Sequence, residues 1–207
     1  MLPTVVLEQR EETAGTVLSR IEAGTVLGVA ANTVGKLLAS GFLPDLAEYR
    51  VAALAGSRHV RVQEGRLPVL RTAAATAPYD AGDGRDFIGD AVFLTDDQFL
   101  QASRQWWRCD PDVIVQAGVL PVAVAGWVTG VLDVHAHEAA TVRRPHEVRH
   151  SFTASVAGRV GTLDDPSTYR ILATDETMAS LTRQLLGSRV QSAVSGGPIA
   201  YLRPTPA

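Results

Sequence analysis

The sequence predicts an α+β protein in which a helical N-terminal unit precedes a mainly β C-terminal unit. Before residue 72 the apolar residues are spaced mostly as in amphipathic helices, whereas after residue 86 short valine-rich runs are separated by glycine and proline. Between them, residues 73–85 are mostly small or polar and include a proline and two glycines, a composition typical of a linker. We therefore expect domains at 1–72 and 86–207, joined by a linker at 73–85.

The composition is that of a globular protein, with 207 residues, 46% of them hydrophobic and 20% charged. The single cysteine, Cys109, can form neither an intramolecular disulfide nor a structural zinc site alone. The first apolar run is too short for a signal peptide. We therefore expect a cytoplasmic protein.

One uncharged stretch, Val113 to Leu132, is long enough on paper to span a bilayer. It contains Pro121 and three glycines, and its valines alternate or cluster as they do in strands. We therefore expect buried β-strands here and no membrane partner.

The formal net charge of −3 argues against nucleic-acid binding by bulk electrostatics. The charge is segregated, however. Residues 76–100 contain one basic and six acidic side chains, whereas the chain on either side of them is slightly basic. Net charge alone therefore excludes no local basic surface.

The N-terminal unit is predicted to contain two helices around a glycine turn. Residues 11–23 have helical apolar spacing with Gly24 as a C-cap, and a second helix starts near Ala31 and ends at Gly41. Such a pair is the helix-turn-helix arrangement, whose second helix enters the major groove of DNA. Its outward polar positions, suited to base edges and phosphates, are Asn32, Thr33, Lys36 and Ser40.

The string LGVAANTVGKLLASGFLP resembles the excisionase and MerR-like winged helix-turn-helix family, over roughly residues 13–62. The family's wing corresponds to residues 54–62, where the resemblance implies phosphate contacts by Arg58, His59 and Arg61. Residues 45–55 are helix-like and depart from the usual hairpin wing. A helical packing module with a solvated charged edge is the alternative.

The C-terminal unit is predicted to contain short strands and two helices, with a tight turn at Ala125-Gly126. The expected strands are 91–95, 113–116, 119–124, 127–134, 149–157 and 199–202, and the expected helices are 96–104 and 175–186. These elements suggest a small β-barrel of mixed topology.

The segments LTDDQFLQASRQWWRCDPDVIVQAGVLPVAVAGWVTGVLDV, VRHSFTASVAG and SGGPIAYL resemble the PUA-like group that includes EVE and ASCH domains, over roughly residues 90–202. The whole arrangement is similar to modified-cytosine-binding proteins of actinobacteria. Two positions depart from the pattern, because Gln105 and Ala154 stand where glycine is usual.

The PUA-like resemblance implies a pocket for a flipped base, with 5-methylcytosine the first expectation. Flat walls could come from Trp106, Trp107, Trp127 and Phe152, and polar contacts from Ser103, Arg104, Arg108 and Asp133. Two adjacent tryptophans in a strand point to opposite faces, so at least one of Trp106 and Trp107 is expected in the core.

Beside the predicted barrel, Arg143, Arg144 and Arg149 could bind phosphates or belong to a solvated loop. His135 and His137 share a strand face near Asp133, but no further clustered ligand completes a metal site. No phosphate-binding loop, nucleophile elbow or HExxH pair is present. We therefore expect no cofactor, no metal and no enzyme activity.

Together these patterns predict a non-enzymatic, nucleoid-associated protein that binds double-stranded DNA through the helix-turn-helix and inspects a base through the PUA-like domain. Two alternatives stay open. One is a helix-turn-helix transcriptional regulator whose C-terminal domain senses a small ligand or dimerises, and the other is an RNA-binding protein.

Overall fold

The computed structural model describes residues 15–78, 83–144, 147–190 and 197–204. Its helices are α1 (Arg20–Leu27), α2 (Ala31–Ser40), α3 (Glu48–Ala55), α4 (Asp96–Ser103), α5 (Pro111–Ala117) and α6 (Glu176–Leu185), with one 3-10 turn at Pro166–Thr168. Its strands are β1 (Leu67–Thr72), β2 (Gln105–Trp107), β3 (Val119–Val124), β4 (Trp127–Arg144), β5 (Glu147–Arg159), β6 (Arg170–Ile171) and β7 (Ile199–Leu202).

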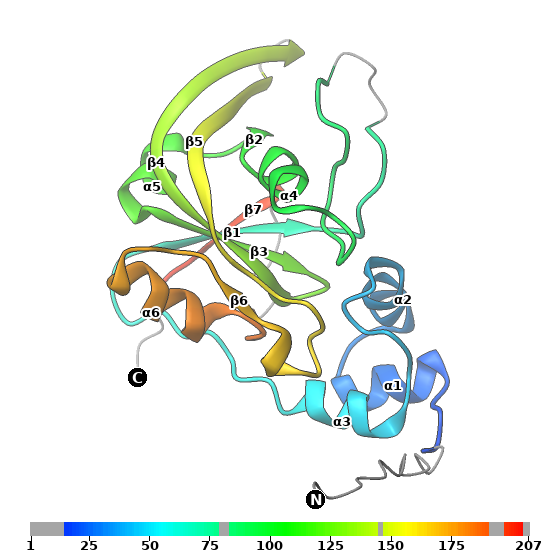
Figure 1. The fold of residues 1–207 in the computed structure, drawn as a ribbon. Helices are drawn as coiled ribbons and strands as arrows, with labels where there is room; N and C mark the ends of the chain where they lie inside the picture. The colour runs from blue at the N-terminus through cyan, green and yellow to red at the C-terminus, as the bar shows by residue number, and fades with distance from the viewer. Residues whose placement is uncertain (1–14, 79–82, 145–146, 191–196, 205–207) are drawn as a thin grey trace, which may run out of the picture.

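All seven strands belong to one curled sheet that forms a half-barrel (Figure 1). The strand order is β2-β5-β4-β3-β1-β7, with β6 added to β5, and only the β1–β3 pair is parallel. The hairpin of β3 and β4 turns at Ala125 and Gly126, whose φ angles of 55° and 98° are those of a tight primed turn. The expected α+β class and this turn are confirmed.

The N-terminal unit contains three short helices. Ser19 and Glu22 form a capping box that starts α1, and Gly28, at φ 62°, ends it. The first helix is therefore 20–27, and the prediction of 11–23 ended by Gly24 was wrong. The second helix begins at Ala31 as predicted, and Gly41 in the left-handed conformation ends it.

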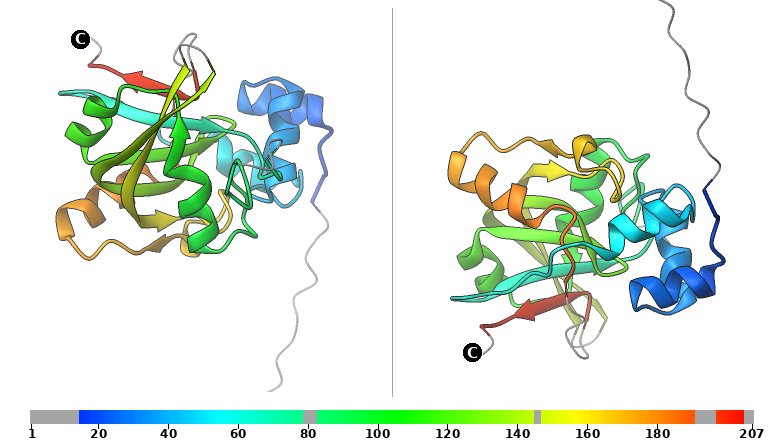
Figure 2. Two further views of the ribbon diagram at one scale, coloured as in Figure 1. Left: turned by 90° about the horizontal axis from the view of Figure 1, so that it is seen from above. Right: turned by 90° about the horizontal axis from the view of Figure 1, so that it is seen from below.

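The three N-terminal helices and the sheet share one apolar core. Leu27, Leu37 and Leu54 are buried in the same cluster as Trp127 and Val128 of β4. Figure 2 shows these helices against one end of the sheet. The helical unit is therefore packed on the half-barrel rather than tethered to it.

The chain does not divide into separate parts at residue 72, and the described part of the expected linker contacts the rest of the protein. Strand β1, which the sequence assigned to the helical unit, pairs with both β3 and β7 inside the sheet. In the 73–85 stretch, Thr76 bridges to Ile88, and Asp83 and Arg85 form a buried ion pair. The described part of this stretch is thus held against the half-barrel.

Most predicted C-terminal elements are present, but two predicted strands are not, the strand predicted at 127–134 runs to Arg144 as β4, and the short strands β2 and β6 were not predicted. Residues 113–116 belong to helix α5, not to a strand, because Asp110 caps the helix and Pro111 occupies its first turn. Residues 91–95 form a loop. Within the described ranges, no helix is both long and apolar enough to cross a bilayer.

A buried ion pair fastens the 90–94 loop to the sheet. Arg159 of β5 donates to an Asp90 carboxylate oxygen at 2.8 Å and to the Leu94 carbonyl at 2.6 Å. The Thr129 hydroxyl donates to the second Asp90 oxygen at 2.6 Å. Burial raises the pKa of Asp90 to about 6 and lowers the pKa of Arg159. Each charge therefore depends on its partner for compensation.

We expect Asp90→Ala to lower the free energy of unfolding by about 3–5 kcal/mol, because Arg159 is then left buried without its main counter-charge. Urea unfolding followed by circular dichroism measures the change. The double variant Asp90→Leu/Arg159→Met should recover most of the loss, since apolar replacement of a whole buried pair is tolerated. A loss below about 1 kcal/mol in the single variant would contradict this role.

Candidate nucleic-acid interface

Helix α2 presents a polar side to solvent. Asn32 and Lys36 are exposed and Thr33 is half-buried, as expected for outward positions. Ser40 is not one of them, because its side chain is only 1% exposed and its hydroxyl donates to the Leu37 carbonyl at 2.9 Å. Ser40 lies three residues after Leu37 and so shares the inward side of the helix.

A basic segment, residues 58–66, runs as one extended stretch between α3 and β1. Its three arginines, Arg58, Arg61 and Arg66, are exposed, and Glu64 is its only acidic residue. The Arg189 amide donates to the Arg58 carbonyl at 2.7 Å, and the Val60 amide donates to the Arg189 carbonyl at 2.9 Å. These two bonds hold the start of the segment, which overlaps the residues that correspond to the wing in the helix-turn-helix resemblance.

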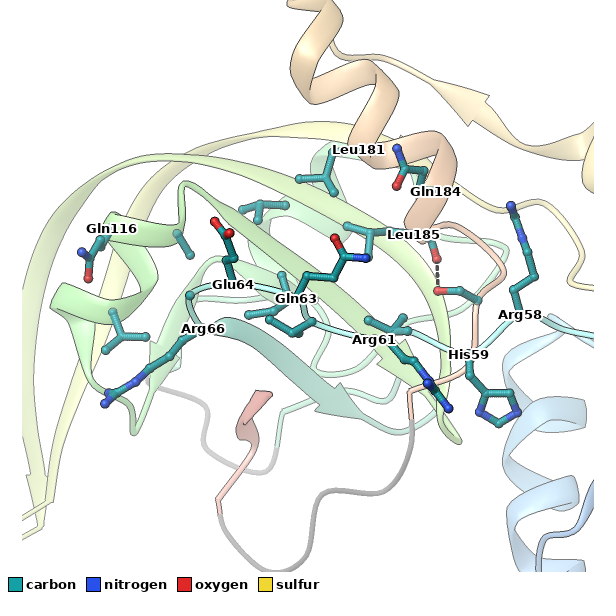
Figure 3. A pocket seen from close by; sticks show the side chains of 18 residues that line it. Arg58, His59, Arg61, Gln63, Glu64, Arg66, Gln116, Leu181, Gln184 and Leu185 are labelled. Carbon is teal, nitrogen blue, oxygen red and sulfur yellow. Dashed lines mark hydrogen bonds between the residues drawn. The ribbon is translucent and has the colours of Figure 1, made fainter. Parts of the chain in front are cut away.

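The basic segment forms one wall of an open groove of about 1110 Å³. Gln116 of α5 and Leu181 and Gln184 of α6 contribute the other walls (Figure 3). The groove therefore combines guanidinium groups with side-chain amides over an apolar floor. Such groups bind phosphate oxygens and base edges.

Arg189 joins the basic segment to the turn before α2. Besides its backbone bonds to the segment, its guanidinium donates to the Gly28 carbonyl at 3.4 Å. The same guanidinium lies 4.7 Å from the centre of the Trp127 ring. Arg189 thus contacts both the turn before α2 and the start of the basic segment.

Sequence reasoning found Arg58 and Arg61 but missed most of the groove. Arg66 follows Arg58 and Arg61 within nine residues, and this local density of arginine is a usable signal. The sequence around Gln116 and Gln184 contains no such signal, because these side chains reach the groove only through the packing of α5 and α6.

Arg149, one of the three basic residues predicted near the β4–β5 hairpin, has protein partners, and so has Arg104 of the predicted base pocket. Arg149 donates from Nε to Glu147 at 2.8 Å and from Nη1 to the Trp106 carbonyl at 3.3 Å. Arg104 donates to Glu138 at 2.6 Å. The side chains of Arg143 and Arg144 lie outside the described residues.

The aromatic residues predicted for a base pocket are mostly buried, and they belong to two different apolar clusters. Trp127 is 0% exposed in the core shared with the helices, whereas Phe152 and Trp107 are buried in a second cluster. Ser103 is buried as well, and its carbonyl accepts a bond from Trp107 Nε1 at 2.7 Å. In the structure these four residues pack the interior.

The remaining predicted pocket residues lie nearer the surface. Trp106 is half-buried with a positive φ of 65°, Arg108 is exposed, and Asp133 is half-buried 3.7 Å from His135. None of the eight residues predicted for the pocket lines the groove. Of that prediction, Trp106 is the one aromatic that the structure leaves partly accessible.

Comparisons with family models, with curated proteins and with solved structures found no match to this chain.

We expect Trp127→Ala to act on stability, lowering the free energy of unfolding by about 3–5 kcal/mol as the loss of a buried aromatic does. The variant also removes the bond from Trp127 Nε1 to Ser57 Oγ, 3.1 Å long. Chemical denaturation measures the effect. Trp106→Ala is the matched control and should cost less, because Trp106 is only half-buried. Equal losses in the two variants would contradict the core assignment of Trp127.

Proposed function

We propose that this protein binds double-stranded DNA, without catalysis, through one surface made of α2 and the basic segment. The observation that supports this most is Arg189, which bonds to the Gly28 turn and to the basic segment at once. The turn that precedes the helix resembling a recognition helix is thereby in contact with the residue that bonds to the start of the basic segment.

The two parts of the surface have complementary chemistry. The amide of Asn32 can bond two edge atoms of adenine in the major groove, and Lys36 offers a charge one helical turn later. Arg58, Arg61 and Arg66 offer planar guanidinium groups that pair with phosphate oxygens. Phosphate contacts would position the protein, and the helix would read the sequence.

We expect Arg61→Ala and Arg66→Ala each to weaken DNA binding and to flatten its dependence on salt. For B-DNA, each lost phosphate contact reduces the slope of log K against log salt by about 0.9. Fluorescence anisotropy with a labelled duplex at several salt concentrations measures both quantities. Arg170→Ala is the control, because Arg170 is exposed, pairs with Asp96 and lies outside the groove. Unchanged slopes in both groove variants, or equal weakening by Arg170→Ala, would refute the proposed surface.

Recognition of 5-methylcytosine stays a prediction from the resemblance, and the same titration tests it with methylated and unmodified duplexes of one sequence. We expect tighter binding of the methylated duplex, with a preference that Trp106→Ala reduces. Phe93→Ala, a variant at an exposed aromatic outside the predicted pocket, should keep the preference. Equal affinity for both duplexes would contradict recognition of the methylated base and leave DNA binding to α2 and the basic segment alone. If A-form RNA displaces the labelled duplex better than unlabelled DNA does, the result would favour an RNA partner.

A further inference from the structure

Two histidines from neighbouring strands meet on the β4–β5 hairpin. Nδ1 of His150 lies 3.0 Å from Nε2 of His137, with the ring centres 5.1 Å apart. From the sequence alone, His137 is expected to share a strand face with His135 instead. In the structure His135 turns to Ser155, with its Nε2 3.2 Å from the hydroxyl oxygen.

Irregular strand pairing creates this arrangement. The register of β4 against β5 shifts between Val134 and Ala136 and again between His137 and Ala139. Such bulges re-aim side chains. His137 pairs with Phe152 between the two shifts, and its ring lies 5.8 Å from the Phe152 ring. His150, two residues before Phe152, therefore projects to the same side of the hairpin.

We propose that His137 Nε2 and His150 Nδ1 bind a divalent transition-metal ion of the zinc, nickel or copper type. Imidazole nitrogen suits these ions. Zinc–nitrogen bonds of about 2.0–2.1 Å at a tetrahedral angle hold two nitrogens about 3.3–3.4 Å apart. The observed distance of 3.0 Å between the two nitrogens is a few tenths of an ångström shorter than this.

His150 is half-buried near two aspartates. Burial and the nearby His137 lower the pKa of His150, while Asp110 and Asp112 act in the opposite direction. Coordination requires that His150 Nδ1 and His137 Nε2 each present a lone pair, with any ring proton on the other nitrogen of each imidazole. The two aspartates also place negative charge near a bound cation.

The pair leaves coordination positions open. Among the described residues, no group of three or more histidine, cysteine, aspartate or glutamate side chains is arranged around one point. Water or an added ligand would fill the other positions, as at metal sites that keep an open position. The site is independent of α2 and the basic segment, so its failure would leave the DNA-binding proposal unaffected.

Isothermal titration of the full chain, without a polyhistidine tag, with zinc chloride at pH 7.5 tests the proposal. We expect one zinc site that His137→Ala or His150→Ala weakens at least about tenfold, since even the loss of an outer partner costs metal sites about 10- to 100-fold. His135→Ala is the matched control, because it removes an exposed imidazole two residues from His137.

A second readout keeps the test independent of variant folding. In the wild-type protein, zinc should shift the ring resonances of His137 and His150 in NMR spectra more than those of His135 and His59. Binding should also weaken in acid, because a protonated imidazole nitrogen cannot coordinate a metal ion. No zinc binding by the wild-type protein, or binding that survives in both the His137→Ala and His150→Ala variants, would overturn the proposal.

Discussion

The burial of Trp127 between the helices and the sheet is the contact on which the arrangement of the molecule depends. Its ring lies in the apolar cluster formed by the N-terminal helices and β4, its Nε1 bonds to Ser57 after α3, and Arg189 lies over its face. One residue of the half-barrel thus packs against the helical unit and touches the arginine that reaches the Gly28 turn. The position of α2 relative to the groove follows from this packing.

This shared core changes how the two parts can act on a ligand. Separate modules on a flexible linker would gain affinity through a raised effective concentration. Here the helices and the sheet form one body, so their surfaces are oriented before binding and no linker entropy is lost on association. The same packing occupies the aromatic side chains that a base pocket would need, because Trp127 and Phe152 fill the interior.

The sequence predicted those helix ends and turns that depend on residues close together in the chain. Gly41 after an apolar stripe marked the end of α2, and the Ala125-Gly126 pair marked the turn between β3 and β4. The valines of α5 fit a strand equally well, and only Asp110 and Pro111 distinguish the helix. The groove and the histidine pair could not be predicted, because the groove combines distant segments and the histidine pair depends on the register of two strands. Whether an aromatic side chain is buried likewise depends on partners far along the chain.

Strand β1 gives the chain an unusual order of assembly. Its parallel partner, β3, is synthesised about fifty residues later, and its other neighbour, β7, is at Ile199–Leu202. While the chain is being made, β1 has both edges open, and the N-terminal helices still lack Trp127 to cover their apolar sides. Co-translational folding of the first 66 residues as a finished unit is therefore disfavoured, and the nascent chain carries an exposed strand edge for much of its synthesis.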